Sequence, residues 1–256
     1  MCGRYASSRR PEDLVEEFEI DQPVLESALE PDFNVAPTKD VYAVLERPAK
    51  GEERPEPERQ LRVLRWGLVP SWAKDPTIGN RMINARVETV TEKPAYKRAF
   101  AKRRCLLPAD GYFEWYPTEE LTKAGKPRKQ PFFIRPKDQG VLAMAGLYEI
   151  WRDPTRAEDD PHRFLWTATV ITTQAEDDLG HIHDRMPMMV ERDRWAAWLD
   201  TTATPDDLRG LLEPAAPGRL EAFPVSTLVS NVRNNGPELV APLPLEQHEQ
   251  QQEGER

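Results

Sequence analysis

Six segments of the chain alternate apolar with polar residues or carry runs of β-branched residues. Alternation with a period of two turns one face of a strand toward a core and the other toward solvent, so each segment is predicted to be a strand. The segments cover residues 41–45, 61–66, 105–107, 132–135, 142–151 and 164–172. The core should therefore be rich in β-structure.

Four other segments carry the wider apolar spacing of amphipathic helices. They cover residues 11–20, 94–102, 192–199 and 205–212. Thr204 precedes the last of them, and the following PDDL places a proline and two acids in the first turn, which predicts Thr204 as the N-cap. We expect an α+β fold in a single domain, with a mixed, largely antiparallel, barrel-like β-core and peripheral helices.

Two internal stretches and the C-terminal end show neither pattern. Residues 47–60 and 152–162 are rich in Pro, Glu, Asp and Arg and are predicted to be surface insertions. The final segment EQHEQQQEGER, residues 246–256, is predicted to be disordered. A chain of 256 residues with 39% hydrophobic composition is long enough for one compact core.

Charge is distributed unevenly along the chain. The formal net charge of -9 argues against a protein coated in positive potential and so against tight, non-specific binding of DNA. Residues 81–104 are the exception, because there basic side chains clearly outnumber the two acids, Glu88 and Glu92. This segment predicts a local basic groove.

The two cysteines, Cys2 and Cys105, belong to no CxxC or other metal-spaced cluster. This argues against a disulfide scaffold and a structural zinc site, and we expect no metal and no organic cofactor. No stretch of about 18 apolar residues is present, and the first twenty residues carry charges throughout. We therefore expect a protein of a reducing cytoplasm that does not bind membranes.

Cys2 directly follows the initiator methionine. Because methionine is generally removed before a small residue, the mature chain is expected to begin with Cys2, which would carry both an α-amine and a thiol. An α-amine titrates near about 8 and a lysine near about 10.4, so this amine is the better nucleophile at neutral pH. It can form an imine with an aldehyde, and the thiol can then close a thiazolidine ring on the same carbon. On position alone, however, a cysteine near a terminus is more often incidental.

Eight ordered segments carry a resemblance to a known family. They are MCGRYA at 1–6, FNVAPT at 33–38, WGLVPSW at 66–72, NARVET at 84–89, RCLLPADGYFEW at 104–115, AGLY at 145–148, HDRMP at 183–187 and NVRNNGPEL at 231–239. From Met1 to about Pro242 the chain resembles the abasic-site-processing proteins, also called SOS-response-associated peptidases. The resemblance implies one domain over residues 1–242, followed by a disordered acidic, Gln-rich tail over 243–256.

The resemblance also implies a site and a partner. Cys2 would form a covalent adduct with an abasic site in single-stranded DNA, while Asn84, Glu114 and His183 would complete the active site. Junctions between single- and double-stranded DNA are suggested as targets, in a cytoplasmic, nucleoid-associated protein of the bacterial type that acts during replication. No obligate protein partner is implied.

Each of these three residues has a physical rationale and a plainer alternative. Asn84 can offer a donor and an acceptor, but an Asn beside a turn is more often a backbone cap. Glu114 between aromatic residues would have a raised pKa, although its strand face could simply be solvated. His183 titrates near neutrality and could donate a proton to the sugar oxygen, whereas a lone histidine, such as nearby His181, is usually structural or exposed.

The residues that would contact DNA are less clearly marked by the sequence. Arg4 and Arg86 would contact phosphates, unless carboxylates pair with them. The bases would stack on aromatic or proline side chains, and the alternative for the tryptophans is a place in the core. The expected stacking residues are Trp66, Pro70, Trp72 and Trp115.

Two other functions compete with covalent capture. In a peptidase, Cys2 and His183 would form a nucleophile pair with Asn84 polarising the carbonyl, acting mainly on the protein's own Met1–Cys2 bond. In a non-catalytic binder, single-stranded DNA would be held by stacking and charge alone. Cys2→Ala would abolish adduct formation and leave such non-covalent binding intact.

Overall fold

Five strands close into a barrel. In the computed structural model, which describes residues 2–48, 57–175 and 179–244, the strands follow the order β11, β10, β7, β4, β5, and β11 then pairs with β5. The closing pair is parallel, with Thr167 opposite Arg65 and Ala168 opposite Trp66, and the other pairs are antiparallel. The five strands are β4 (Asp40–Pro48), β5 (Pro57–Trp66), β7 (Arg104–Ala109), β10 (Leu142–Arg152) and β11 (Phe164–Gln174). The α+β prediction with a barrel-like core is confirmed.

Alternate residues of the strands fill two separate cores. One face of each strand points into the barrel, where Leu64, Trp66 and Val170 are among the fully buried side chains. The opposite face packs against helices, where Trp195 and Trp198 contribute to the second core. This period-two division is the pattern that the alternating segments of the sequence predict.

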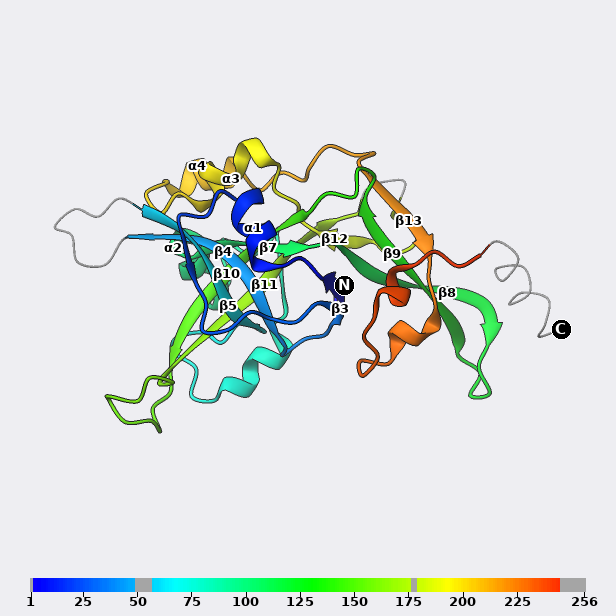
Figure 1. The fold of residues 1–256 in the computed structure, drawn as a ribbon, viewed down its shortest axis with the longest axis horizontal. Coiled ribbons are helices and arrows are strands. Elements are labelled where there is room, and N and C mark those ends of the chain that lie inside the picture. Colours follow the sequence, from blue (N-terminus) through cyan, green and yellow to red (C-terminus); the bar gives the residue numbers. More distant parts are fainter. Residues whose placement is uncertain (1, 49–56, 176–178, 245–256) are drawn as a thin grey trace.

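The helices cover one outer face of the barrel (Figure 1). They are α1 (Pro11–Glu17), α2 (Pro94–Lys102), α3 (Trp195–Leu199) and α4 (Pro205–Gly210). The prediction for 94–102 matches α2, whereas the segment 192–199 divides into a 3₁₀ turn, Arg192–Arg194, followed by α3. Thr204 caps α4 as predicted, since its hydroxyl accepts from the backbone N–H of Asp207 and the Asp207 carboxylate accepts from that of Thr204.

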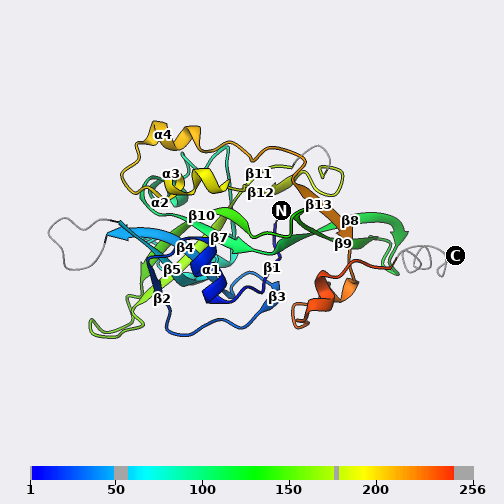
Figure 2. The ribbon, with the colours of Figure 1, turned by 45° about the horizontal axis from the view of Figure 1, so that its top comes forward.

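A second, five-stranded sheet lies beside the barrel, in the order β13, β9, β8, β1, β3. Its strands are β1 (Tyr5–Ser7), β3 (Asp32–Val35), β8 (Gly111–Leu121), β9 (Pro127–Pro136) and β13 (Leu220–Pro224). Figures 1 and 2 both place the N-terminus between the barrel and the β8, β9 and β13 strands. The N-terminal residues therefore lie where the two sheets meet.

Short strands complete the barrel sheet. β6 (Asn84–Arg86) runs parallel to β11, with Asn84 opposite Val170, and β12 (Arg185–Pro187) pairs antiparallel with the same end of β11. β2 (Gln22–Val24) adds to β5. β6 and β12 are more than ninety positions apart in the sequence, and both pair with the same end of β11.

All six predicted strands are confirmed, but the prediction of a surface insertion at 47–60 is wrong for the residues the structure describes. β4 and β5 extend through this region as a hairpin, and Gln60 is only 5% exposed. Arg59 and Glu46 form an ion pair of 3.0 Å across the two strands, so the charges mark strand positions and not a loop. Residues 49–56 and the tail from 245 lie outside the described residues. The other insertion, 152–162, is an exposed turn as predicted.

The segment after β13 is fastened to the N-terminal part of the second sheet. Asn34 on β3 is fully buried, and its Nδ2 donates to the carbonyl oxygens of Val229, Asn231 and Asn234 at 3.2, 3.0 and 2.9 Å. Arg4 Nη1 donates to the Val229 carbonyl at 2.8 Å as well. These bonds join the two ends of the domain.

Candidate functional site

Cys2 lies beside the strand that carries Glu114. β1 pairs antiparallel with β8, with Tyr5 opposite Tyr112, and the next bond in this direction runs from the Phe113 N–H to the Arg4 carbonyl at 2.9 Å. Continued toward the N-terminus, this register places Gly3 opposite Glu114 and Cys2 opposite Trp115, so that Cys2 lies one position from the strand partner of Glu114. The Cys2 side chain is 0% exposed and packs into the barrel core.

Asn84 holds the backbone of Cys2. Its Nδ2 donates to the Cys2 carbonyl at 2.7 Å, and the hydroxyl of Tyr96 on α2 donates to the Asn84 carbonyl at 3.1 Å. The other side-chain atom, Oδ1, is buried and has no hydrogen-bond partner among the described residues. One end of the amide thus fixes Cys2 while its acceptor end remains available for a ligand.

Glu114 is buried next to Cys2. The carboxyl is 4% exposed, and burial raises its pKa to about 7, with the negative charge of Asp184 as a further cause. Burial, and then the nearby Glu114, raise the pKa of the Cys2 thiol well above its usual range. At neutral pH the site therefore contains a neutral thiol beside a carboxyl that exchanges its proton readily.

His183 lies on the segment that leads into β12. The backbone N–H of Arg185 donates to Nδ1 at 3.0 Å, and an Asp184 carboxylate oxygen also lies 3.0 Å from Nδ1. Because Asp184 is 86% exposed, the backbone bond is the firmer constraint, and it assigns the proton of the neutral ring to Nε2. Burial lowers the pKa of His183, so this neutral form is favoured at pH 7.

An ion pair joins the segments of Asn84 and His183. The guanidinium of Arg185 contacts both carboxylate oxygens of Glu88, at 2.5 and 3.1 Å, and donates to the Thr172 carbonyl at 2.6 Å. An arginine two residues after His183 could either orient the imidazole or bind phosphate. Its backbone does the first, and its side chain is engaged by Glu88 and Thr172. The sequence marked Glu88 only as one of two acids in a basic segment, with no sign that it pairs with Arg185.

The arrangement brings the four expected catalytic residues together from four parts of the chain. Asn84 contacts Cys2 directly, Glu114 acts electrostatically on Cys2, and Asp184 acts on both Glu114 and His183. Asn84 lies on β6 of the barrel sheet and His183 on the segment before β12, whereas Glu114 lies on β8 of the second sheet and Cys2 precedes β1. The site is therefore a product of the junction between the sheets.

The expected DNA-contact residues are divided by the structure. Trp66 is 0% exposed and donates from Nε1 to the Ile83 carbonyl at 2.9 Å, and Pro70 is also buried, so the expectation that these two stack on bases is wrong for this conformation. Trp72, in contrast, is 62% exposed. The core alternative considered for the tryptophans applies to Trp66 and not to Trp72.

Arg4 and Trp115 form a partly buried pair next to Cys2. The Arg4 guanidinium lies 5.5 Å from the centre of the Trp115 ring, and Nη1 also donates to Asn34 Oδ1 at 2.7 Å. Trp115 donates from Nε1 to the Ser230 hydroxyl at 3.0 Å. Amide and carbonyl oxygens thus bind Arg4, and the suggested pairing with a carboxylate does not occur among the described residues. Arg86 is exposed.

The basic segment 81–104 serves two purposes. Arg104 is 3% exposed and donates to the carbonyls of Trp198 and Phe100, each at 2.7 Å, while Arg103 pairs with buried Glu149. These two residues are structural. The remaining basic side chains are exposed: Arg81, Arg86, Lys93, Lys97, Arg98 and Lys102.

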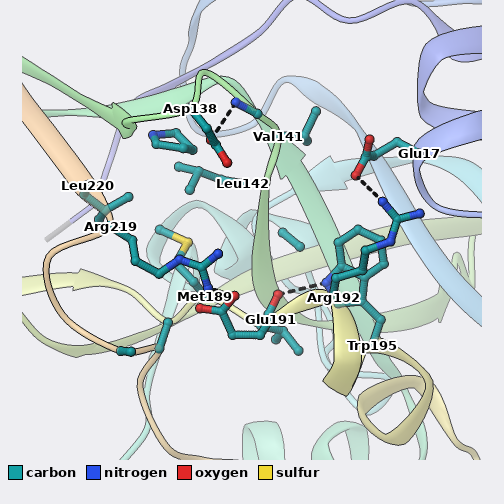
Figure 3. Close-up of a pocket in the computed structure, with 16 residues that line it drawn as sticks. Glu17, Asp138, Val141, Leu142, Met189, Glu191, Arg192, Trp195, Arg219 and Leu220 are labelled. Atoms are coloured by element: carbon teal, nitrogen blue, oxygen red, sulfur yellow. Dashed lines mark hydrogen bonds and ion pairs between the residues drawn. The ribbon is translucent and has the colours of Figure 1, made fainter.

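A cavity of about 300 Å³ lies elsewhere, between α3 and the turn joining β9 to β10 (Figure 3). Its wall includes apolar Leu142 and Met189, and its two arginines are paired, Arg192 with Glu17 at 3.3 Å and Arg219 with Glu191. None of the expected site residues lines it. This cavity is thus separate from the candidate site at Cys2.

The described part of the chain contains no cluster of three or more His, Cys, Asp or Glu side chains arranged to hold a metal ion. None of its helices has the length and apolar character needed to span a membrane.

Comparison with known proteins gives consistent matches over most of the chain. The abasic site processing protein YoqW of Bacillus subtilis is 39% identical over 94% of this chain and 99% of its own length. The protein HMCES of Xenopus tropicalis, also named an abasic site processing protein, is 30% identical over 96% of this chain and 80% of its own.

Solved structures share the fold. A crystal structure of a protein from Bacteroides thetaiotaomicron superposes with a TM-score of 0.77 at 23% identity, covering 95% of this chain and 100% of that one. The family model described as SOS response associated peptidase matches residues 1–232. With the site geometry and these matches together, the chain belongs to the SOS response associated peptidase (SRAP) family.

Proposed function

We propose that the protein captures abasic sites in single-stranded DNA by forming a thiazolidine between Cys2 and the aldehyde of the lesion. The observation that carries this proposal is the 2.7 Å bond from Asn84 Nδ2 to the Cys2 carbonyl, because it fixes the residue that would bear the reacting amine and thiol. The names of the relatives, abasic site processing proteins, support the same substrate.

The order of bond formation follows from the protonation states. The Cys2 thiol is neutral, since burial raises its pKa, so attack begins from the α-amine that removal of Met1 would expose. The amine adds to the aldehyde carbon and water leaves, which gives an imine. The sulfur then adds to the imine carbon while the thiol proton passes to the nitrogen, so that the whole reaction releases one water.

Glu114 and His183 divide the proton transfers in this proposal. With a pKa near 7, the Glu114 carboxyl can take a proton from the attacking amine and return it to the leaving hydroxyl. His183, with its proton on Nε2, can donate to the ring oxygen of the sugar and favour the open aldehyde. The free Oδ1 of Asn84 can accept from a hydroxyl of the same sugar.

The surroundings of the site suit a single strand. Exposed Trp72 can stack on a base, half-buried Trp115 can do so at its open edge, and Arg4 and Arg86 can approach phosphates. These contacts are independent of base identity, as a sensor of a missing base requires. The action we propose is shielding of the lesion during replication.

Peptidase activity on other proteins is less well supported. A thiol that is 0% exposed and whose pKa is raised is a poor nucleophile toward an incoming peptide bond. Cleavage limited to the chain's own Met1–Cys2 bond would avoid this difficulty, because that bond is already at the site. We retain self-processing as a step that prepares the amine.

Intact mass spectrometry tests the proposal. The full chain is incubated with single-stranded DNA that bears one abasic site and is then denatured. The expected mass is that of the protein without Met1, plus the DNA, minus one water, with the link mapped to Cys2. DNA carrying a tetrahydrofuran analogue, which has no aldehyde, and the Cys105→Ala variant with the true lesion are the controls: the first should give no adduct and the second a normal one. Retention of Met1 in the adduct, or a link at Cys105 or at a lysine, would show that the mechanism is wrong.

A further inference from the structure

Two arginines converge on one tryptophan at the end of the barrel where β11 begins. The guanidinium of Arg62 on β5 lies 4.5 Å from the centre of the Trp166 ring, and that of Arg47 on β4 lies 5.0 Å from it. Tyr148 on β10 stacks on Trp166, with ring centres 5.8 Å apart and an angle of 12° between the planes. We call Arg47, Arg62, Tyr148 and Trp166 the arginine–tryptophan site.

The positive charge of this site is not balanced by a carboxylate among the described residues. Arg62 donates from Nε to the neutral side chain of Gln60 at 2.9 Å, and neither Arg62 nor Arg47 forms an ion pair with a described acid. Glu58 is the strand partner of Arg47, yet it does not come within ion-pair distance. Burial, and then the charge of Arg47, lower the pKa of Arg62, which indicates that the two cations repel each other.

Other buried or partly buried arginines have oxygen partners for their η nitrogens, either neutral, as at Arg4 and Arg104, or carboxylate. Arg59 is paired with Glu46 at 3.0 Å, Arg103 is paired with Glu149, and Arg185 is paired with Glu88. Holding two guanidiniums together without an acid is unfavourable unless an anion joins them. The aromatic ring offsets part of the cost but carries no net charge.

We propose that the arginine–tryptophan site binds a phosphate group. The two η nitrogens of Arg62 and the whole guanidinium of Arg47 make no hydrogen bond to a described residue, and both groups are held by stacking on one ring. Guanidinium forks match the oxygens of phosphate and form charge-assisted bonds to them. The hydroxyl of Tyr148, which also lies within the field of Arg47 and Arg62, can add a further donor.

This site is distinct from the one at Cys2. Trp166 lies near the start of β11, whereas Asn84 pairs with Val170 four residues further along, about 13 Å away at the usual rise of a strand. Figure 1 shows the corresponding ends of β4 and β5 pointing away from the N-terminus. The inference therefore stands whether or not Cys2 reacts with DNA.

Calorimetric titration of the full chain with inorganic phosphate, at constant ionic strength in chloride buffer, tests the inference. The wild type should bind phosphate, and Arg47→Gln/Arg62→Gln should bind it about tenfold more weakly or worse, because two charge-assisted contacts are lost. Arg209→Gln, at an exposed arginine paired with Asp206 on α4, is the matched control and should bind as the wild type does.

Two additions keep the experiment decisive. If the double glutamine variant does not fold, Arg47→Lys/Arg62→Lys retains charge but loses the planar fork, and it should also bind phosphate more weakly. Repeating the wild-type titration with saturating, undamaged single-stranded DNA identifies the source of the phosphate. Weaker binding of phosphate then indicates a DNA backbone, and unchanged binding indicates a small phosphorylated molecule. Absence of binding to the wild type, or equal binding to the wild type and the folded variants, would overturn the inference.

Discussion

The backbone N–H of Arg185 donates a 3.0 Å hydrogen bond to Nδ1 of His183, while the side chain of the same arginine contacts Glu88. One residue therefore sets the tautomer of the imidazole and also links it to the segment of Asn84. A histidine held in this way presents Nε2–H toward its surroundings without needing a charge. The geometry permits hydrogen-bond donation at neutral pH, and full proton transfer becomes easier as the pH falls.

His183→Ala should slow capture of an abasic site without preventing it. General acid catalysis by one group typically contributes about a hundredfold to ten-thousandfold, so a loss in this range is expected in single-turnover crosslinking. Because burial lowers the pKa of His183 from 6.5, the part of the pH–rate profile that it controls should lie below pH 6.5 and vanish in the variant.

His181→Ala is the matched control, since His181 is exposed and only approaches Tyr116, with ring centres 6.5 Å apart. It should crosslink at nearly the wild-type rate. A wild-type rate and pH profile for His183→Ala would assign the acid to another residue, with Glu114 next in line.

Glu114→Gln should slow capture and at the same time stabilise the fold at alkaline pH. The folded-state pKa of about 7 exceeds the ordinary 4.5, so the stability linked to this proton is full below about pH 4.5 and is lost as the pH rises through 7. The difference corresponds to at most roughly 3 kcal/mol. Thermal unfolding at pH 5 and pH 8 should show a gain for the variant mainly at pH 8.

The same variant should remove the part of the crosslinking pH profile that titrates near pH 7. Glu119→Gln is the control for a lost carboxyl, because Glu119 lies on the same strand but is exposed. It should behave like the wild type. Equal melting temperatures of Glu114→Gln and wild type at pH 8 would argue that the carboxylate is not destabilised by burial.

Glu88→Gln should slow crosslinking, Arg185→Met should slow it at least as much because it also removes the bond to the Thr172 carbonyl, and the double variant should be no slower than Arg185→Met alone. The reason is that both substitutions remove the same ion pair, which positions the segments of Asn84 and His183. Glu88→Asp should recover part of the rate. Circular dichroism and the pH–rate profile separate the positioning role from unfolding. A misplaced His183 would change the shape of the part of the profile below pH 6.5, whereas partial unfolding would lower the rate by the same factor at every pH.

Trp66→Ala should lower the stability of the fold, whereas Trp72→Ala should lower the affinity for single-stranded DNA. Trp66 is fully buried, so its truncation should lower the free energy of unfolding by about 3–5 kcal/mol. Trp72 is 62% exposed, so its truncation should leave stability within about 0.5 kcal/mol. It should instead weaken binding of single-stranded DNA by about 1–3 kcal/mol, the range for loss of one stacking platform. Denaturant unfolding and fluorescence anisotropy measure the two quantities, and unchanged DNA affinity for Trp72→Ala would remove it from the interface.

Local patterns in the sequence were sufficient for the strands of the barrel and for the helices. Alternation marks β4, β5, β10 and β11 because each of them has one face in the barrel and one under helices. The long hairpin strand β8 was expected only as the short alternating stretch around Glu114. Short strands such as β6 and β12 were missed, since a strand of three residues has no period to detect. Closure of the barrel by β11 and β5 depends on contacts about one hundred residues apart, which no local pattern reveals.

The expected site residues were predicted from motifs. The motifs could not distinguish residues that are exposed for a ligand from residues that are buried in the core. Trp66 and Trp72 stand in the same segment, WGLVPSW, yet one is core and the other exposed, because the chain leaves the strand after Trp66. Asn34 is also in a motif, FNVAPT, but its role appears only when Val229 and Asn234 lie against it. Burial and pairing depend on partners that are distant in the chain.

The bonds from Arg4 and Asn34 to the carbonyl of Val229 also bear on how the protein is made. Val229 leaves the ribosome 225 positions after its partner Arg4. Chains are synthesised at about 5–20 residues per second, so the N-terminal end waits on the order of ten seconds or more for its last contacts. During that interval Arg4 and Asn34 lack their carbonyl partner at Val229, so the segment that carries Cys2 becomes fixed only when most of the domain has been synthesised.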